Sequence, residues 1–294
     1  MNKKIQFIVL GLCTLIGAQA QAMTVLSSVK PINLIVQELT DGVSESTYLV
    51  PQSASPHDYA LRPSDIKKVK KADMIIWYGN DLEPFLSKIL KDQKNVVTIS
   101  QFSSVDFFHF DQHDHADEGG HHHNTDPHFW LGPKETLAVA KEITIQLIKI
   151  DPLNKEQYQS NLAVFENKLT QAVKTISDQL KPVQDKGYFV FHDAYGYFER
   201  YFGMNNLGHF TVSPDRKPGA KSLINIKKSL LNQQAVCVFS EPQFEPAIVT
   251  TITRGTEVHK GELDPLAIQQ TDEKGAYFIF LSTISNELSR CLSQ

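Results

Sequence analysis

LNKEQYQSNLAVFENKLTQAVKTISDQLK, residues 153–181, predicts one long amphipathic helix, around which the other predicted elements are arranged. It contains neither glycine nor proline, and Pro182 ends it. At 1.5 Å per residue the helix is about 40 Å long, the diameter of a whole lobe. Apolar residues recur at spacings of three and four and predict a single apolar stripe: Leu162, Phe165, Leu169, Val173, Ile176 and Leu180.

Strand-like and helix-like segments alternate on both sides of this helix. Pro63 opens a predicted helix that runs to Lys71 with Ser64 as its cap, and another helix follows Pro133. β-branched and aromatic runs predict strands at 24–29, 47–50, 74–78 and 96–99, and again at 188–191, 207–212, 236–240 and 277–281. This alternation predicts an α/β fold with parallel sheets. The predicted parts are an N-terminal lobe at 23–150, a rigid connecting helix at 151–182 and a C-terminal lobe at 183–294.

The first 22 residues have the pattern of a secretory signal peptide. Lys3 and Lys4 precede an apolar run from Ile5 to Ile16, and small residues suit cleavage after Ala20 or Ala22. About twelve apolar residues are too few to cross a bilayer, which needs roughly 20. We therefore expect an exported protein whose mature chain begins after this segment.

Charge and cysteine content narrow the class of protein further. The chain of 294 residues has a formal net charge of −4, which argues against a nucleic-acid binder. Removing residues 1–22 leaves two of the three cysteines, Cys237 and Cys291. Two cysteines in an exported chain favour a disulfide. The alternative, two thiolates on a metal ion, lacks the usual CxxC spacing.

The eleven histidines are the unusual feature of the composition, since seven of them fall between His109 and His128. Residues 107–126 mix histidine with aspartate and glutamate and hold almost no apolar side chain after Phe110, which predicts a surface loop. Such a loop would bind zinc weakly, because no scaffold fixes the ligand geometry. The histidines of this secondary, weak site are His109, His113, His115, His121, His122 and His123.

Three other histidines are candidates for a preorganised site. His57 follows the predicted strand 47–50, His192 follows the strand 188–191, and His128 precedes the helix after Pro133. Ligands of open α/β sheets bind beyond the carboxyl ends of the strands. Three imidazoles suit Zn²⁺, with Asp264 or water as the fourth ligand. The neighbouring carboxylates Asp58, Asp126 and Asp193 are candidate hydrogen-bond partners of the three rings.

Motifs of nucleophilic or phosphate chemistry are missing from the sequence. It contains no GxSxG elbow, no HExxH pair and no Walker-type glycine loop. A zinc hydrolase stays open as an alternative, because three histidines with an open position also describe a catalytic zinc site. Its nearest candidate general base is Glu241.

Several long motifs resemble one known family. They are SPHDYALRPSD (55–65), DPHFWLGP (126–133), FHDAYGYFERYFG (191–203), CVFSEPQF (237–244) and TRGTEVHKGELDPL (253–266). They resemble the zinc-uptake solute-binding proteins of Gram-negative bacteria, the ZnuA type, within the cluster-A branch of ABC-transporter binding proteins. The resemblance covers essentially the whole mature chain.

This resemblance implies two lobes, each with a four-stranded parallel sheet flanked by helices, and one tight zinc site in the cleft between them. The family's ligands fall on His57, His128 and His192, and its disulfide falls on Cys237 and Cys291. Some relatives have a glutamate before the first ligand, where this chain has Pro56. The fourth ligand is therefore Asp264, a loop histidine or water.

The implied function is capture of Zn²⁺ in the periplasm by a monomer that delivers the ion to an inner-membrane ABC permease. A periplasmic zinc-binding accessory protein is a further candidate partner. Protons compete for the imidazoles, so affinity should fall as the pH drops through about 6.5. The alternatives are a zinc buffer or chaperone without a transporter and, last, a mononuclear zinc hydrolase.

Overall fold

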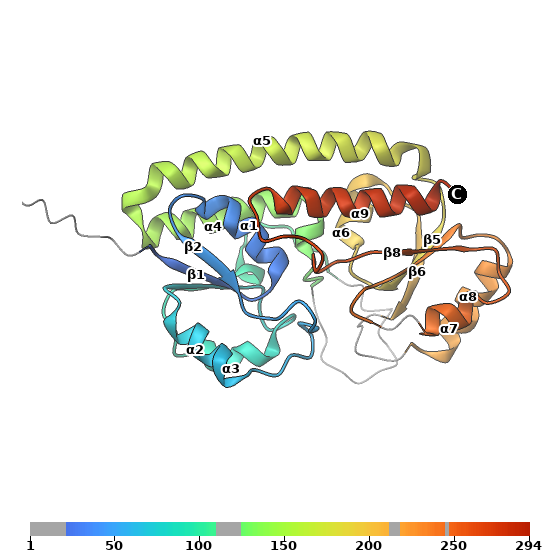
Figure 1. Cartoon of the computed structure of the whole chain (residues 1–294), viewed down its shortest axis with the longest axis horizontal. Helices are drawn as coiled ribbons and strands as arrows, with labels where there is room; N and C mark the ends of the chain where they lie inside the picture. Colours follow the sequence, from blue (N-terminus) through green and yellow to red (C-terminus); the bar gives the residue numbers. More distant parts are fainter. Residues whose placement is uncertain (1–21, 110–124, 212–217, 245–246) are drawn as a thin grey trace, which may run out of the picture.

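The computed structural model describes residues 22–109, 125–211, 218–244 and 247–294 and contains two four-stranded parallel sheets (Figure 1). The first has the order β2-β1-β3-β4 and the second the order β6-β5-β7-β8, so both lobes repeat one topology. The strands are β1 (Thr24–Ser27), β2 (Glu45–Tyr48), β3 (Met74–Trp77), β4 (Val96–Thr98), β5 (Tyr188–His192), β6 (Asn206–Thr211), β7 (Cys237–Ser240) and β8 (His259–Glu262).

Helices cover both faces of each sheet. They are α1 (Lys30–Thr40), α2 (Pro63–Lys71), α3 (Ser87–Leu90), α4 (Pro133–Ile150), α5 (Lys155–Leu180), α6 (Gly196–Phe202), α7 (Ala220–Leu231), α8 (Ala247–Thr253) and α9 (Ala276–Leu292). Short 3-10 turns lie at Pro84–Leu86, Ile99–Gln101, Phe129–Leu131, Pro152–Asn154 and Lys181–Val183. Within the described ranges, no helix is both long enough and apolar enough for a membrane crossing.

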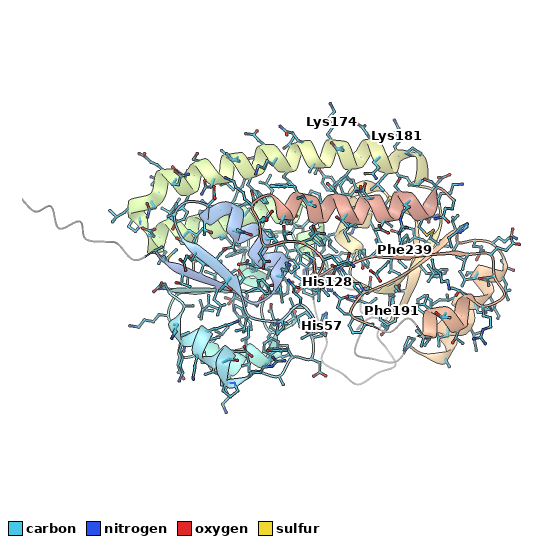
Figure 2. All side chains as sticks on the ribbon, in the orientation of Figure 1. His57, His128, Lys174, Lys181, Phe191 and Phe239 are labelled. Carbon is cyan, nitrogen blue, oxygen red and sulfur yellow. A yellow bond between two sulfur atoms is a disulfide. The ribbon has the colours of Figure 1, made fainter. Side chains whose placement is uncertain are left out.

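The predicted long helix is confirmed as α5, which spans both lobes with α9 beside it (Figure 1). All six residues of the predicted stripe pack in or against the core, whereas Lys174 on the opposite face points away from both lobes (Figure 2). Beneath α1, α4, α5 and α9 lies one apolar core that takes residues from both sheets. Because the lobes share this core, a hinge motion between them would have to open packed apolar surface.

Side chains of the strands alternate between this shared core and a smaller core on the outer face of each sheet. In β5 and β7, Phe239 faces the shared core, whereas Phe191 faces α7 and α8 (Figure 2). In the first lobe, Ile76 faces the shared core and Ile75 faces α2 and α3. Each sheet is thus buried on both faces, as expected for parallel strands.

The strand predicted at 277–281 is wrong, because these residues belong to α9. The run Tyr277-Phe278-Ile279-Phe280-Leu281 is apolar and aromatic, and a short apolar run does not reveal its period. The helical period appears only further along, where Ile284 and Leu288 are buried on the same side as Tyr277 and Leu281.

The fourth strand of the second sheet is instead β8, whose sequence His-Lys-Gly-Glu carries no strand signal. Gly261 in this edge strand lies against the ring of Phe239, and a Cβ atom there would come within 2.5 Å of Phe239 Cε1. The need to accommodate the Phe239 ring therefore explains a glycine in a strand.

Three local features of the structure differ from the sequence-based prediction. Helix α1 was not predicted, and β2 begins two residues before the predicted 47–50. The cap of α2 is Arg62 rather than Ser64, and the carboxylate of Asp65 accepts a hydrogen bond from the Arg62 backbone N–H. The helix start therefore uses the acidic side chain of its first turn.

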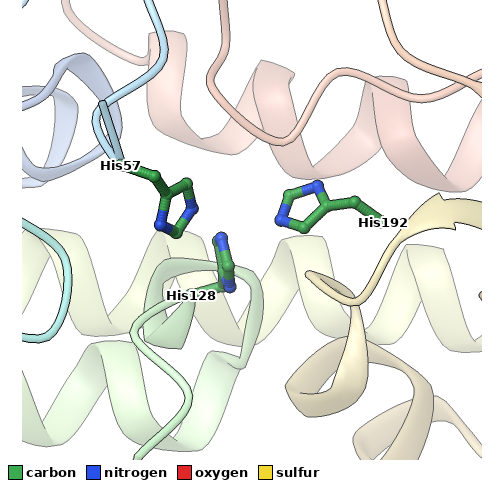
Figure 3. A group of neighbouring side chains, drawn as sticks. All are labelled: His57, His128 and His192. Atoms are coloured by element: carbon green, nitrogen blue, oxygen red, sulfur yellow. The ribbon is translucent and has the colours of Figure 1, made fainter. Parts of the chain in front are cut away.

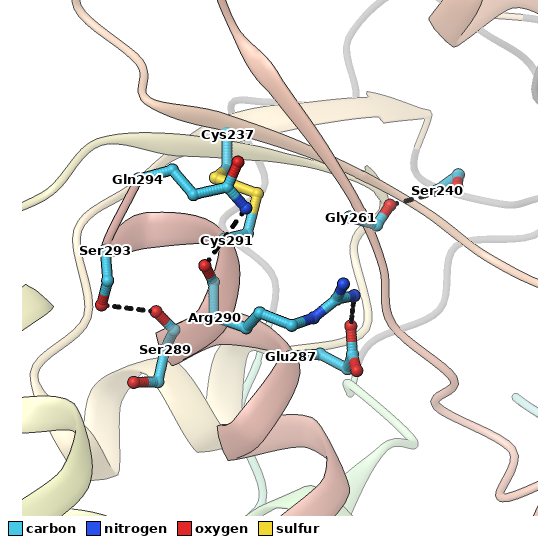
Figure 4. Close-up of a disulfide and its surroundings, with 9 residues drawn as sticks. All are labelled: Cys237, Ser240, Gly261, Glu287, Ser289, Arg290, Cys291, Ser293 and Gln294. Atoms are coloured by element: carbon cyan, nitrogen blue, oxygen red, sulfur yellow. Dashed lines mark hydrogen bonds and ion pairs between the residues drawn. A yellow bond between two sulfur atoms is a disulfide. The ribbon is translucent and has the colours of Figure 1, made fainter.

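The predicted disulfide is confirmed between Cys237 of β7 and Cys291 of α9 (Figure 4). The two Cα atoms lie 6.1 Å apart, within the normal range for a disulfide. It ties the end of α9 to the second sheet, and both sulfur atoms are buried. The alternative of metal-bound thiolates is wrong, since the sulfur atoms are bonded to each other.

Glu83 joins the carboxyl ends of β1 and β3 inside the first lobe. Its carboxylate accepts hydrogen bonds from the Ser28 hydroxyl and from the backbone N–H groups of Tyr78 and Gly79. The side chain is fully buried, and burial raises the pKa of Glu83 to about 7 although the hydrogen bonds lower it. The folded protein therefore binds this proton more tightly than the unfolded chain does.

This raised pKa predicts a pH-dependent stability. The contribution of Glu83 is fully present below its ordinary pKa of 4.5 and is lost as the pH rises towards about 7. Relative to Glu83→Gln, the wild-type free energy of unfolding should fall by about 3 kcal/mol over this range. Urea denaturation of both proteins at several pH values measures the difference. A difference that stays constant with pH would contradict the prediction.

Candidate metal centre

The three candidate histidines come from three separate parts of the chain. His57 lies in the loop after β2, His128 directly precedes the 3-10 turn Phe129–Leu131, and His192 is the last residue of β5. β2 and β5 are parallel strands of different sheets, and the chain leaves both at their carboxyl ends, where ligand sites of such sheets form.

The tertiary structure brings the three rings together between the lobes (Figure 3). Each ring offers one nitrogen, and these three atoms all lie within 4.8 Å of one another. Around a tetrahedral Zn²⁺ such nitrogens are about 3.3 Å apart, so modest ring movements complete the geometry. The cavity between the rings is also lined by Glu241, Phe244, Pro265 and Leu266, together with Ser55 and Pro56.

Asp126 orients His128. One carboxylate oxygen, Oδ1, accepts the backbone N–H of His128 at 2.9 Å and lies 2.8 Å from Nδ1 of its ring. Both side chains are buried. When Nδ1 donates its proton to this carboxylate, Nε2 becomes the metal-binding nitrogen. The sequence-based prediction that Asp126 is the hydrogen-bond partner of His128 is confirmed.

Glu241 plays the same role for His192. Its Oε1 atom lies 2.8 Å from His192 Nδ1 and also accepts a 3.3 Å hydrogen bond from the Tyr195 hydroxyl. His192 Nε2 is buried and has no hydrogen-bond partner among the described residues. A buried ring nitrogen of this kind suits a metal ion, since an unsatisfied polar atom is otherwise costly.

The charges of the site match a divalent cation. When Asp126 and Glu241 are ionised and the three imidazoles are neutral, the site has a charge of −2, which Zn²⁺ would neutralise. Burial raises the pKa of Asp126 to about 7. Burial lowers the pKa of His192, but the charge and hydrogen bond of Glu241 raise it more, so the net pKa is above its ordinary 6.5. A proton therefore competes with a cation for this imidazole.

Comparison with known families agrees with this arrangement. The family model of ZnuA, described as zinc-uptake complex component A, periplasmic, matches residues 25–291. This chain belongs to the ZnuA family. Among its relatives is a high-affinity zinc uptake system protein ZnuA of Yersinia pestis, 44% identical over 288 residues and covering 91% of each chain. Another, from Haemophilus ducreyi, is 39% identical over 289 residues and covers 92% of this chain and 93% of the relative.

Solved structures agree on the fold. A crystal structure of ZnuA superimposes with a TM-score of 0.79 at 23% identity and covers 92% of this chain and 99% of that one. A structure of AdcAII from Streptococcus pneumoniae gives a TM-score of 0.77, also at 23% identity. ZnuA-like proteins therefore share the two-lobed α/β fold with its long connecting helix.

In this ZnuA family member, the other candidate ligands named from the sequence are Asp264 and the six histidines of the 107–126 segment. Asp264 is not part of the three-histidine group, and its carboxylate accepts hydrogen bonds from the backbone N–H groups of Leu266 and Gln269. Its role as fourth ligand stays a prediction. Of the histidines in the 107–126 segment, His109 pairs with Thr125, and the other five lie outside the described residues.

The carboxylate predicted beside His192 is wrong. Asp193 Oδ2 lies 3.6 Å from Nδ1 of His209 in β6, and Glu241 is the carboxylate beside His192. The chain position of Glu241 offered the missing signal, because it directly follows β7, the strand that pairs with β5. Asp58 is exposed, and its pairing with His57 stays a prediction.

Proposed function

We propose that this protein is the periplasmic zinc-binding component of a zinc-uptake ABC transporter. It captures Zn²⁺ and delivers the ion to a permease in the inner membrane. The observation that carries this function is the cluster of His57, His128 and His192, whose ligand atoms lie within 4.8 Å of one another. Membership in the ZnuA family supports the transport role and the permease partner.

The chemistry of the donor set favours zinc. Imidazole nitrogens bind Zn²⁺ well, whereas Mn²⁺, Mg²⁺ and Ca²⁺ prefer oxygen ligands. Cu²⁺ and Ni²⁺ are the competing ions for such a site. Where water takes the fourth position, only three protein ligands have to release the ion, which suits a carrier. Asp264 or water completes the coordination in this proposal.

The location proposed for the protein is the periplasm, reached through the signal peptide at residues 1–22. There it acts as a monomer. The histidines of the 107–126 segment supply weaker, secondary zinc binding that is separate from the main site. A periplasmic zinc-binding accessory protein is a further proposed partner.

The two alternative functions have less support. For a zinc hydrolase, Glu241 was the candidate general base, but its Oε1 already lies 2.8 Å from His192 Nδ1 and the residue is 3% exposed. A carboxylate that orients a ligand is poorly placed to take a proton from substrate. A zinc buffer without a transporter would have the same site. Growth of a deletion strain in chelated medium separates a zinc buffer from a transport component. Only loss of a transport component would prevent zinc uptake in that medium.

Calorimetric titration of the metal-stripped mature protein with zinc tests the proposed function. The matched comparison is the same protein lacking residues 112–124. We expect one tight site in both proteins and additional weak binding only in the intact one, because the three cluster histidines lie outside the deletion. Loss of the tight site together with the segment would overturn the assignment to His57, His128 and His192.

A further inference from the structure

The two ends of the His-rich segment 107–126 are hydrogen-bonded to each other. The backbone N–H of Asp126 donates to the carbonyl oxygen of Phe108 at 2.8 Å, and His109 and Thr125 form an antiparallel bridge beside this pair. These four residues form a short stem at the base of the segment. Because Asp126 belongs both to the stem and to the hydrogen bond with His128, the stem and the metal centre share a residue.

Tyr197, a residue of the second lobe, forms hydrogen bonds with both sides of this stem. It lies on α6, and its hydroxyl accepts the backbone N–H of Phe108 at 2.9 Å and donates to the carbonyl oxygen of Asp126 at 2.9 Å. The residue is 4% exposed. One hydroxyl thus satisfies two backbone groups, one on each side of the stem.

Further contacts hold the same arrangement. The guanidinium of Arg200, one turn along α6, lies 3.7 Å from the centre of the Phe108 ring. From the first lobe, the Tyr78 hydroxyl lies 3.3 Å from the carbonyl oxygen of Asp126. Side chains of both lobes therefore meet at the peptide group of Asp126.

We propose that Tyr197 is a positioning residue for metal binding, although it does not contact the ion. It fixes the backbone of Asp126 at the stem. Asp126 in turn holds the backbone N–H and the ring of His128, so that Nε2 of this ring faces the site. A side chain of the second lobe thereby sets the orientation of a ligand contributed by the first lobe.

This inference rests on the proposed zinc function, and its main consequence is a change in affinity. Tyr197→Phe keeps the ring but removes the hydroxyl that accepts the Phe108 N–H and donates to the Asp126 carbonyl oxygen. Residues that hydrogen-bond to metal-bound histidines contribute about 10- to 100-fold to metal affinity. Tyr197 acts one step further away, so we expect zinc to bind about 5- to 20-fold more weakly.

Tyr158→Phe is the matched control. Tyr158 is also buried, and its hydroxyl also makes two hydrogen bonds, to Ser44 and Asp151. It lies on α5, and its partners lie just before β2 and just after α4. Its removal should lower stability by an amount similar to that of Tyr197→Phe and leave zinc affinity unchanged. Urea denaturation of the metal-free proteins checks that the two variants are comparable.

The experiment measures zinc affinity by competition with a chelator in a double-mutant cycle of Tyr197→Phe and Asp126→Asn. The absorption spectrum of bound Co²⁺ reports the ligand geometry in the same proteins. We expect weaker binding and an altered spectrum for Tyr197→Phe, neither for Tyr158→Phe, and a combined effect smaller than the sum, because both residues act through His128.

Unchanged affinity in Tyr197→Phe would overturn the inference, as would equal losses in both tyrosine variants or additive effects in the cycle. Failure of the proposed function is a different result. In that case the wild-type protein itself shows no tight zinc site, or His192→Ala leaves the tight site intact.

Discussion

Replacing His192 with alanine is expected to weaken zinc binding at the tight site by more than about 100-fold. Residues that hydrogen-bond to metal ligands already contribute about 10- to 100-fold to metal affinity, and we expect a ligand itself to contribute more. His192 is 3% exposed and its Nδ1 atom is held by Glu241, so the imidazole is preorganised. The alanine variant also leaves the Glu241 charge buried without this partner.

Chelator competition with zinc measures this loss, and two comparisons define its origin. His209→Ala removes another histidine of the second lobe, one that pairs with Asp193 and lies outside the cluster, and should leave tight binding intact. Deletion of residues 112–124 should cost much less than His192→Ala, because it removes only secondary ligands. Equal losses from the deletion and from His192→Ala would show that the cluster is not the main site.

Removal of the disulfide is expected to lower the free energy of unfolding by about 4 kcal/mol. Cys237 and Cys291 are 54 positions apart, and the chain entropy of a closed loop of about this length gives that figure. The crosslink also holds the last turn of α9 on β7 (Figure 4). α9 contributes Tyr277, Phe280, Ile284 and Leu288 to the shared core, so its release would loosen both lobes.

Urea denaturation of the double variant Cys237→Ser, Cys291→Ser, compared with the oxidised wild-type protein, measures this effect. The wild-type protein under reducing conditions is a second comparison and should behave like the double variant. A loss of less than about 1 kcal/mol would contradict the prediction and would mean that packing of α9 alone fixes the second lobe.

The sequence predicted well those elements whose pattern is local. In α5, apolar side chains recur with the helical period over 26 residues, and that length makes the period unambiguous. Short segments were less informative. The run 277–281 has the composition of a strand, yet it lies in α9, and β8 has the composition of a loop, yet it completes a sheet. In both cases the deciding contacts come from distant residues, such as Phe239 over Gly261.

The candidate ligands of the metal centre and the cysteines of the disulfide could be named from the chain alone, because histidines beside predicted strands and helices and a pair of cysteines are visible in the sequence. Which of these groups lie in contact became clear from the three-dimensional fold. The packing of two parallel sheets brings His57, His128 and His192 within 4.8 Å and places Glu241 rather than Asp193 against His192. No local pattern records this contact, because His192 and Glu241 are 49 residues apart and meet only through the register of β5 with β7.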